Sequence, residues 1–419
     1  MSTKAAPAPK IVRVPISNVY GGGDYTAQLN IGSQNVAVNL IMDTGSSTLA
    51  VKQGKYKAAA DKNLKSSAYA QDVTYGTGGW AGPVVTTTIT MGTAKNAVTL
   101  RNSPMAIADD QQPNNFGAAD GILGLAYNAL NNAYNLSNYL RQRGLNPAVT
   151  YPWPFSNSTS NALLAQLQQL FSKMQQEDIP PYFTEIESKG ITANKFAFYT
   201  LRSVPSMSGG NPERNPLNQG VFVLGGGDEG DAADLYSGDT FLSVDVVDDA
   251  WYNTNLRAVQ VGGSHPVSVP PLPTQYATSM ISNSIIDSGT NSLAVSKHVL
   301  SAILDGLNKA NPLFVQLIEK AVQSRQGITA SALKLSEWPN ISFTLAGEKG
   351  EDVVLTCSPQ TYWQVDAPAA GQAMFQINDM GGVQSILGLP LLNNYFTVFD
   401  RSIDSYGAIR FAPIKPPSN

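Results

Sequence analysis

One stretch occurs twice in this chain, and this repeat constrains the fold more than any other feature. Residues 41–51 read IMDTGSSTLAV and residues 285–295 read IIDSGTNSLAV, with six of eleven positions identical. Three of the five differences exchange serine and threonine, so the hydroxyl is kept. Each copy predicts a strand that enters a tight turn and presents one carboxylate, Asp43 or Asp287. A chain that builds this turn twice can bring two carboxylates together.

A second, shorter repeat follows each carboxylate turn in the same order. Residues 121–125 read GILGL, and residues 385–389 read SILGL. Two repeats in one order indicate a divergent internal duplication. A chain of 419 residues is also too long for one ordinary core. We therefore predict a mainly β, bilobal protein with short helices, whose lobes span residues 1–203 and 204–419. The Pro-, Gly-, Ser- and Asn-rich loop 204–219 is the expected linker.

Local patterns predict further elements. Two extended runs around a Gly-rich tip at residues 72–80 predict a β-hairpin. Apolar residues at helical spacing predict a helix at 161–176, and helices are also expected at 128–143, 296–307 and 312–323.

Composition excludes several kinds of chemistry. The net charge of -4 argues against a nucleic-acid partner. Cys357 is the single cysteine, so no internal disulfide is possible, and we expect it in the core. His265 and His298 are the only histidines and have no second His or Cys at ligand spacing, so we predict no metal site.

No targeting or membrane segment is expected either. No apolar run approaches the ~18–20 residues of a membrane span. The N-terminus has no apolar signal core, which predicts a cytoplasmic protein as given, or a periplasmic or secreted one if a leader was removed.

The two carboxylate turns suggest a specific chemistry. Two close carboxylates cannot both ionise cheaply, so one of Asp43 and Asp287 is expected to hold a proton. Gly45 and Gly289 would let the two backbones approach. Neighbouring hydroxyls can donate to the carboxylates and orient them, and they belong to Thr44, Ser46, Ser288 and Thr290. An acid and a base that share a water can hydrolyse a carbonyl compound without a metal, cofactor or covalent intermediate.

These motifs resemble those of the pepsin-like aspartic peptidases from about residue 25 to the C-terminus. The turns at Asp43 and Asp287 are similar to the two catalytic loops of that family. The segment Tyr75-Gly76-Thr77-Gly78 resembles the hairpin that closes over the substrate, called the flap. The resemblance implies a bilobal fold with the active site between the lobes, and an acid endopeptidase that acts on polypeptides. It also implies a monomer that is inhibited by pepstatin.

The sequence departs from the family pattern in informative ways. Family members commonly have a Trp that supports the flap tyrosine where this chain has Ala50, and Trp80 is a candidate substitute. An aromatic residue is often found where Ala119 stands, and Phe116 is a candidate to cover the same pocket. The chain has no disulfides and no basic pro-segment before Asp43. In these respects it is similar to bacterial pepsin homologues, and it either starts after a pro-segment or never had one.

The resemblance also implies a peptide-binding cleft with an apolar subsite. Ile41, Tyr75, Phe116 and Ile122 are its candidate walls, although Ile41, Phe116 and Ile122 are equally compatible with plain core packing. Bulky apolar residues are then expected on both sides of the scissile bond. Two alternatives belong to other functional classes: a catalytically silent, inhibitor-like binder on the same fold, and a carbohydrate-binding protein, which only the Gly/Ser/Asn-rich composition favours.

Overall fold

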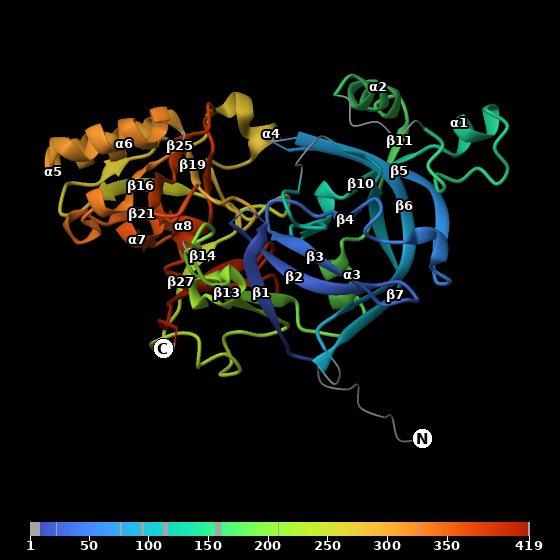
Figure 1. Cartoon of the computed structure of the whole chain (residues 1–419), viewed down its shortest axis with the longest axis horizontal. Coiled ribbons are helices and arrows are strands. Elements are labelled where there is room, and N and C mark those ends of the chain that lie inside the picture. Colours follow the sequence, from blue (N-terminus) through green and yellow to red (C-terminus); the bar gives the residue numbers. More distant parts are fainter. Residues whose placement is uncertain are drawn as a thin grey trace.

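The computed structural model describes residues 9–21, 23–75, 78–93, 96–111, 116–155, 161–207, 209–324 and 326–417. The fold is mainly β, as the sequence predicts, and the two halves of the chain occupy opposite sides of the molecule (Figure 1). The lobe boundary near residue 204 remains a prediction.

A 16-stranded sheet runs through the molecule and joins the two halves. Its first-half strands are β1 (Val12–Gly21), β2 (Asp24–Ile31), β3 (Val36–Asp43), β4 (Leu49–Lys52), β5 (Lys65–Tyr75), β6 (Gly78–Met91), β7 (Val98–Ala108), β8 (Asp110–Gln111), β9 (Gly121–Gly124), β10 (Asn132–Asn135) and β11 (Gln175–Asp178). Beyond β1 the sheet continues in the order β13-β12-β27-β28-β14. These strands span β12 (Lys195–Tyr199), β13 (Gln219–Leu224), β14 (Leu242–Asp245), β27 (Tyr395–Asp400) and β28 (Ala408–Pro413).

Three smaller sheets lie in the second half of the chain. The first contains β15 (Asn253–Thr254), β18 (Ser284–Ile286), β19 (Leu293–Val295), β25 (Ile377–Asp379) and β26 (Ser385–Leu387). The second contains β16 (Leu256–Val261), β17 (Val267–Ser268), β21 (Ile341–Ala346) and β22 (Asp352–Cys357), and the third contains β20 (Ile328–Thr329), β23 (Trp363–Val365) and β24 (Gln372–Phe375).

The helices are short, apart from two that pack against each other in the second half (Figure 1). They span α1 (Ser137–Gln142), α2 (Asn161–Phe171), α3 (Tyr182–Ser188), α4 (Ala277–Met280), α5 (Lys297–Ala310), α6 (Pro312–Ser324), α7 (Pro359–Tyr362) and α8 (Leu389–Leu392). In the described part of the chain, none is long and apolar enough to cross a membrane.

The helices predicted at 296–307 and 312–323 are confirmed as α5 and α6, and Cys357 is buried in the core. The helix predicted at 128–143 is wrong, because residues 132–135 form β10, which pairs with β5 and β11 and separates a short 3-10 helix, Asn128–Leu130, from α1. The predicted helix 161–176 ends at Phe171 as α2, because its last predicted residues, 175 and 176, belong to strand β11. Pairing with a neighbouring strand outweighs weak local helix propensity here.

The internal duplication is visible in the strand pairing. In the first half, β3 runs parallel to β9, which also pairs antiparallel with β4. In the second half, β18 runs parallel to β26, which also pairs antiparallel with β19. The GILG and SILG repeats therefore form the strands beside the two aspartate turns, and the same three-strand unit presents each carboxylate.

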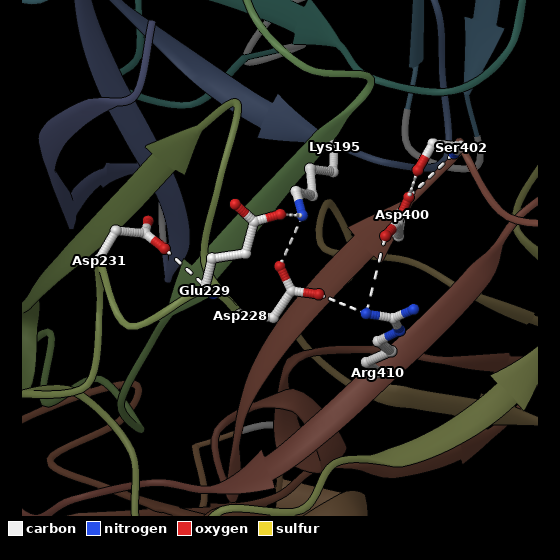
Figure 2. A network of polar contacts seen from close by, with 7 residues as sticks. All are labelled: Lys195, Asp228, Glu229, Asp231, Asp400, Ser402 and Arg410. Carbon is white, nitrogen blue, oxygen red and sulfur yellow. Dashed lines mark hydrogen bonds and ion pairs between the residues drawn. The ribbon is translucent and has the colours of Figure 1, made fainter. Parts of the chain in front are cut away.

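An ionic network centred on the buried Asp228 crosses the sheet where the two halves meet (Figure 2). Lys195 Nζ on β12 lies 2.8 Å from Asp228 Oδ1 and 2.6 Å from Glu229 Oε1. Arg410 on β28 pairs with the other oxygen of Asp228 and lies 3.8 Å from Asp400 on β27. The network thus connects three strands and one loop through Asp228, whose side chain is 5% exposed, whereas Glu229 at its edge is 66% exposed.

Candidate active site

Asp43 ends β3, and Asp287 directly follows β18, so each three-strand unit presents one carboxylate at the end of a strand. Hydrogen bonds cross between the turns in a symmetric pattern. The Thr44 hydroxyl donates to Ile286 O at 3.1 Å and accepts from Ser288 N at 2.9 Å. The Ser288 hydroxyl donates to Met42 O at 2.7 Å and accepts from Thr44 N at 3.1 Å. All four groups are buried, so this exchange locks one turn to the other.

The two glycines that follow the aspartates lie against the opposite carboxylates. A Cβ on Gly45 would stand 2.7 Å from Asp287 Oδ2, and a Cβ on Gly289 would stand 2.3 Å from Asp43 Oδ1. Any larger residue would therefore push the carboxylates apart. Both aspartates are 7% exposed, so the pair is largely shielded from solvent.

Each carboxylate is oriented by its own turn. Gly45 N donates to Asp43 Oδ1 at 2.7 Å, and Ser46 Oγ donates to Asp43 Oδ2 at 2.5 Å. The second turn repeats this geometry, with Gly289 N at 2.8 Å from Asp287 Oδ1 and Thr290 Oγ1 at 2.6 Å from Oδ2. The predicted donors are thus in place for Ser46 and Thr290, whereas Thr44 and Ser288 donate to backbone carbonyls of the opposite half.

The site favours a proton on this pair of carboxyls. Burial raises the pKa of Asp43 well above its usual range, and the nearby charge of Asp287 raises it further. Hydrogen bonds from Ser46 and Gly45 oppose the shift but do not cancel it. Such a pair can act as an acid and a base at once.

The predicted apolar walls form one cluster next to the first turn. Ile41, Phe116 and Ile122 are buried there at 8%, 2% and 5% exposure, together with Ala50, Trp80, Ala106, Ala108 and Ala119, and Val73 packs against them. Trp80 lies in the same cluster as Ala50, and Phe116 lies in the same cluster as Ala119. Their small exposed areas show that these side chains are mainly core, with little surface of their own toward solvent.

The hairpin predicted at 72–80 is confirmed by the pairing of β5 with β6 from Asp72↔Ala81 to Tyr75↔Gly78. We call β5 and β6 the flap hairpin. Gly76 and Thr77, predicted at its tip, lie outside the described residues, and of Tyr75 the structure describes the backbone alone.

Sequence reasoning missed a third carboxyl close to the pair. Asp24 opens β2, and its Oδ1 is buried with no hydrogen-bond partner among the described residues. Burial raises the pKa of Asp24 well above its usual range, as does the charge of Asp287, whereas Arg202 opposes the shift. The only sequence signal is an acidic residue that directly follows a triple-glycine turn.

Arg202 is the buried cation of this region, and sequence reasoning missed it as well. Its guanidinium donates to Asn291 Oδ1 at 2.9 Å and to Asn291 O at 3.1 Å, four residues after Asp287. It also donates to Gln364 Oε1 at 3.2 Å. Burial lowers the pKa of Arg202 to about 10, and the charge of Asp24 is among the effects that counteract this. The charged side chain of Arg202 therefore supports the second turn through its hydrogen bonds to Asn291.

Trp251 is a further residue without a sequence signal. Its indole Nε1 donates to Gly45 O at 3.1 Å, and so joins the second half of the chain to the first aspartate turn. In the described part of the chain, no three His, Cys, Asp or Glu side chains are grouped in a way that could hold a metal ion.

Comparison with known proteins points to one family. The sequence matches the profile of the family described as eukaryotic aspartyl protease over residues 24–149 and 170–413. It is 24% identical to cathepsin D of Gallus gallus over 96% of this chain and 83% of that protein. It is also 24% identical to pepsin-2B of Gadus morhua over 93% of this chain and 96% of that protein. A shorter match, 28% identical to rhizopuspepsin-5 of Rhizopus niveus, covers 29% of this chain and 33% of that protein.

Proposed function

The chain belongs to the family of eukaryotic aspartyl proteases, and from this premise we propose that it is an active endopeptidase that uses Asp43 and Asp287. The observation that carries the proposal is the packing of each carboxylate against the glycine of the opposite turn. Each carboxylate accepts hydrogen bonds from a backbone amide and a hydroxyl of its own turn, so both turns keep the geometry that orients an aspartate.

The proposed chemistry needs one proton shared by the pair. The carboxyl of the pair that holds the proton donates a hydrogen bond to the carbonyl oxygen of the scissile peptide. The other carboxylate takes a proton from the water molecule as the water oxygen attacks the carbonyl carbon. The tetrahedral intermediate collapses when the leaving nitrogen receives a proton from the pair and the C–N bond breaks. The water supplies one hydroxyl and one proton to the two products, so the pair returns to its starting state.

The acidic pH optimum follows from the same proton. Above the pH at which the pair loses it, two carboxylates are ionised side by side and no acid remains to polarise the carbonyl. Cleavage of a denatured protein is therefore expected to be fastest in acid and to fall toward neutral pH. Pepstatin is expected to abolish it.

The assay is cleavage of a denatured protein between about pH 3 and 7, with and without pepstatin. Acidic, pepstatin-sensitive cleavage supports the endopeptidase. Binding of pepstatin without any cleavage across this range would instead favour the silent, inhibitor-like alternative.

We further propose a preference for bulky apolar residues on both sides of the scissile bond. The apolar cluster of Ile41, Phe116 and Ile122 beside the first turn supports this, because the surface that Ile41 and Ile122 keep, 8% and 5% exposed, is apolar. Cleavage of a peptide library at acidic pH tests the preference, and selection of basic or small residues at both positions would overturn it.

A further inference from the structure

Helix α2 lies along the outer face of the flap hairpin (Figure 1). Successive side chains of a strand point to opposite faces, and Val73 packs inward against the cluster that contains Ile41. Asp72 and Thr74 therefore face outward. Gln168 of α2 meets this outer face, since its side-chain amide donates to the Thr74 hydroxyl at 2.8 Å.

The contact between α2 and the flap hairpin is mainly apolar. Leu164, Leu167 and Phe171 of α2 are buried at 4%, 4% and 0% exposure, in one cluster with Ala70 of β5 and Ala81 of β6. Both alanines are fully buried. Such small residues let the helix approach the sheet closely, so α2 is packed on the hairpin over several turns.

The contacts extend toward the tip of the hairpin. At the far end of α2, the rings of Phe171 and Tyr134 lie 5.5 Å apart between centroids, and Tyr134 pairs with Ala70. At the other end, Leu164 Cδ2 lies 3.5 Å from the place where a Cβ on Gly79 would stand. Gly79 lies two residues after Thr77 in the sequence, so α2 extends along the hairpin nearly to its tip.

We propose that α2 is a brace for the flap hairpin, and that Gln168 and Leu164 are positioning residues that hold it against the strand carrying Asp43. The proposal rests on the proposed function, in which the hairpin covers the bound peptide. The hairpin is thereby held from both faces, by Trp80 and its cluster inside and by α2 outside. Substrate binding then depends on side chains that touch neither substrate nor dyad.

Loss of the brace is expected to weaken substrate binding more than chemistry. Gln168→Ala removes one exposed hydrogen bond, so we expect KM to rise about two- to fivefold. We expect kcat to change less than twofold, because Asp43 and Asp287 stay in place. Leu164→Ala removes buried contact near the tip and should raise KM by about tenfold. In both variants, backbone amides of β5 and β6 near the tip should exchange hydrogen faster.

The chain offers a matched control on the same helix. Gln166 is exposed, and Gln166→Ala is expected to leave KM and hydrogen exchange unchanged. Thr74→Val should reproduce the effect of Gln168→Ala, and the double variant should be no worse than either single one.

Hydrogen exchange separates failure of the brace from failure of the proposed function, since it needs no activity. Unchanged tip exchange in both Gln168→Ala and Leu164→Ala, with each variant folded, overturns the brace whether or not the protein is a protease. An equal change of KM in Gln166→Ala and Gln168→Ala would overturn the brace as well. Faster exchange confined to the hairpin in a protein without proteolytic activity would leave the brace standing and contradict the proposed function.

Discussion

The aspartate pair is held by side chains that belong to the opposite half of the chain. Thr44 is fully buried, and its hydroxyl both donates and accepts across the two turns. Thr44→Val keeps the shape but leaves Ser288 N and Ile286 O unpaired. We expect a loss of about 1–3 kcal/mol in unfolding free energy. We also expect a ten- to hundredfold lower kcat/KM, in line with roughly 10²-fold losses from ~1 Å misplacement.

Denaturant unfolding and steady-state kinetics measure these two effects. Thr90→Val, on β6 away from the turns, is the matched control and should change neither quantity much. A Thr44→Val protein with normal kcat/KM would mean that the crossed hydrogen bonds do not align the carboxylates.

Asp24 makes the stability of the protein depend on pH. Its pKa is raised by burial and by Asp287, so the folded protein holds this proton more tightly than the unfolded chain. This contribution to stability is complete below the ordinary aspartate pKa, and it is lost as pH rises through the folded pKa. Asp43 acts in the same direction. We therefore predict that the protein loses stability as pH rises above the ordinary aspartate pKa.

Asp24→Asn tests this sign directly, because asparagine cannot ionise. The variant should lose less unfolding free energy than the wild type between acidic and neutral pH, as measured by urea denaturation at several pH values. Parallel stability curves for the two proteins would show that Asp24 does not titrate differently on folding.

At the scale of elements, the flap hairpin depends on Trp80. This side chain is fully buried beside Ala50, on a strand that does not pair with β4. Trp80→Ala should cost about 3–5 kcal/mol by leaving a cavity. Ala50→Trp alone should cost about 1–3 kcal/mol by overpacking the same space.

The double variant Trp80→Ala/Ala50→Trp distinguishes shared space from two separate sites. If the two positions fill one volume, the double variant should be more stable than the sum of the single effects predicts, as measured by thermal or urea unfolding. Strict additivity would contradict the idea that Trp80 occupies the space beside Ala50.

The elements that the sequence predicts well are those whose pattern lies within their own residues. The two aspartate turns repeat both their residues and their order, and α5 and α6 have regular apolar spacing. Each could therefore be identified without knowing which distant segment packs against it. Asp24 and Arg202 could not, because their importance arises from side chains that pairing brings from distant segments. The contact of α2 with the hairpin was missed for the same reason. Its apolar face was visible, but nothing local identifies the strands that it covers.

At the scale of the whole molecule, the network around Asp228 joins a strand from the middle of the chain to strands near its C-terminus (Figure 2). Burial raises the pKa of Asp228, but the hydrogen bond and charge of Lys195, with the charge of Arg410, lower it overall. Its stabilising effect is therefore present above the ordinary aspartate pKa and is lost as pH falls through the folded value. Asp24 and Asp228 thus place the stability maximum in mild acid.

Asp228→Ala leaves Lys195 and Arg410 without their shared partner. Removal of one member of a buried ion pair costs about 3–5 kcal/mol, so we expect a deficit of that size near pH 5. The deficit should shrink as pH falls toward 2, where the wild type also loses the pair. Urea unfolding at the two pH values checks this, and a deficit that grows in acid would contradict the assignment.

The most direct test of the central claim is the kcat/KM for peptide cleavage near pH 4 of Asp43→Asn and Asp287→Asn, each beside the wild type. Asparagine keeps the size of the side chain but removes one ionisable group from the pair. Asp249→Asn, at an exposed site, is the control. The account predicts that each of the two variants loses at least about a thousandfold in kcat/KM while remaining folded, and that the control does not. Wild-type activity in either Asp43→Asn or Asp287→Asn would contradict it.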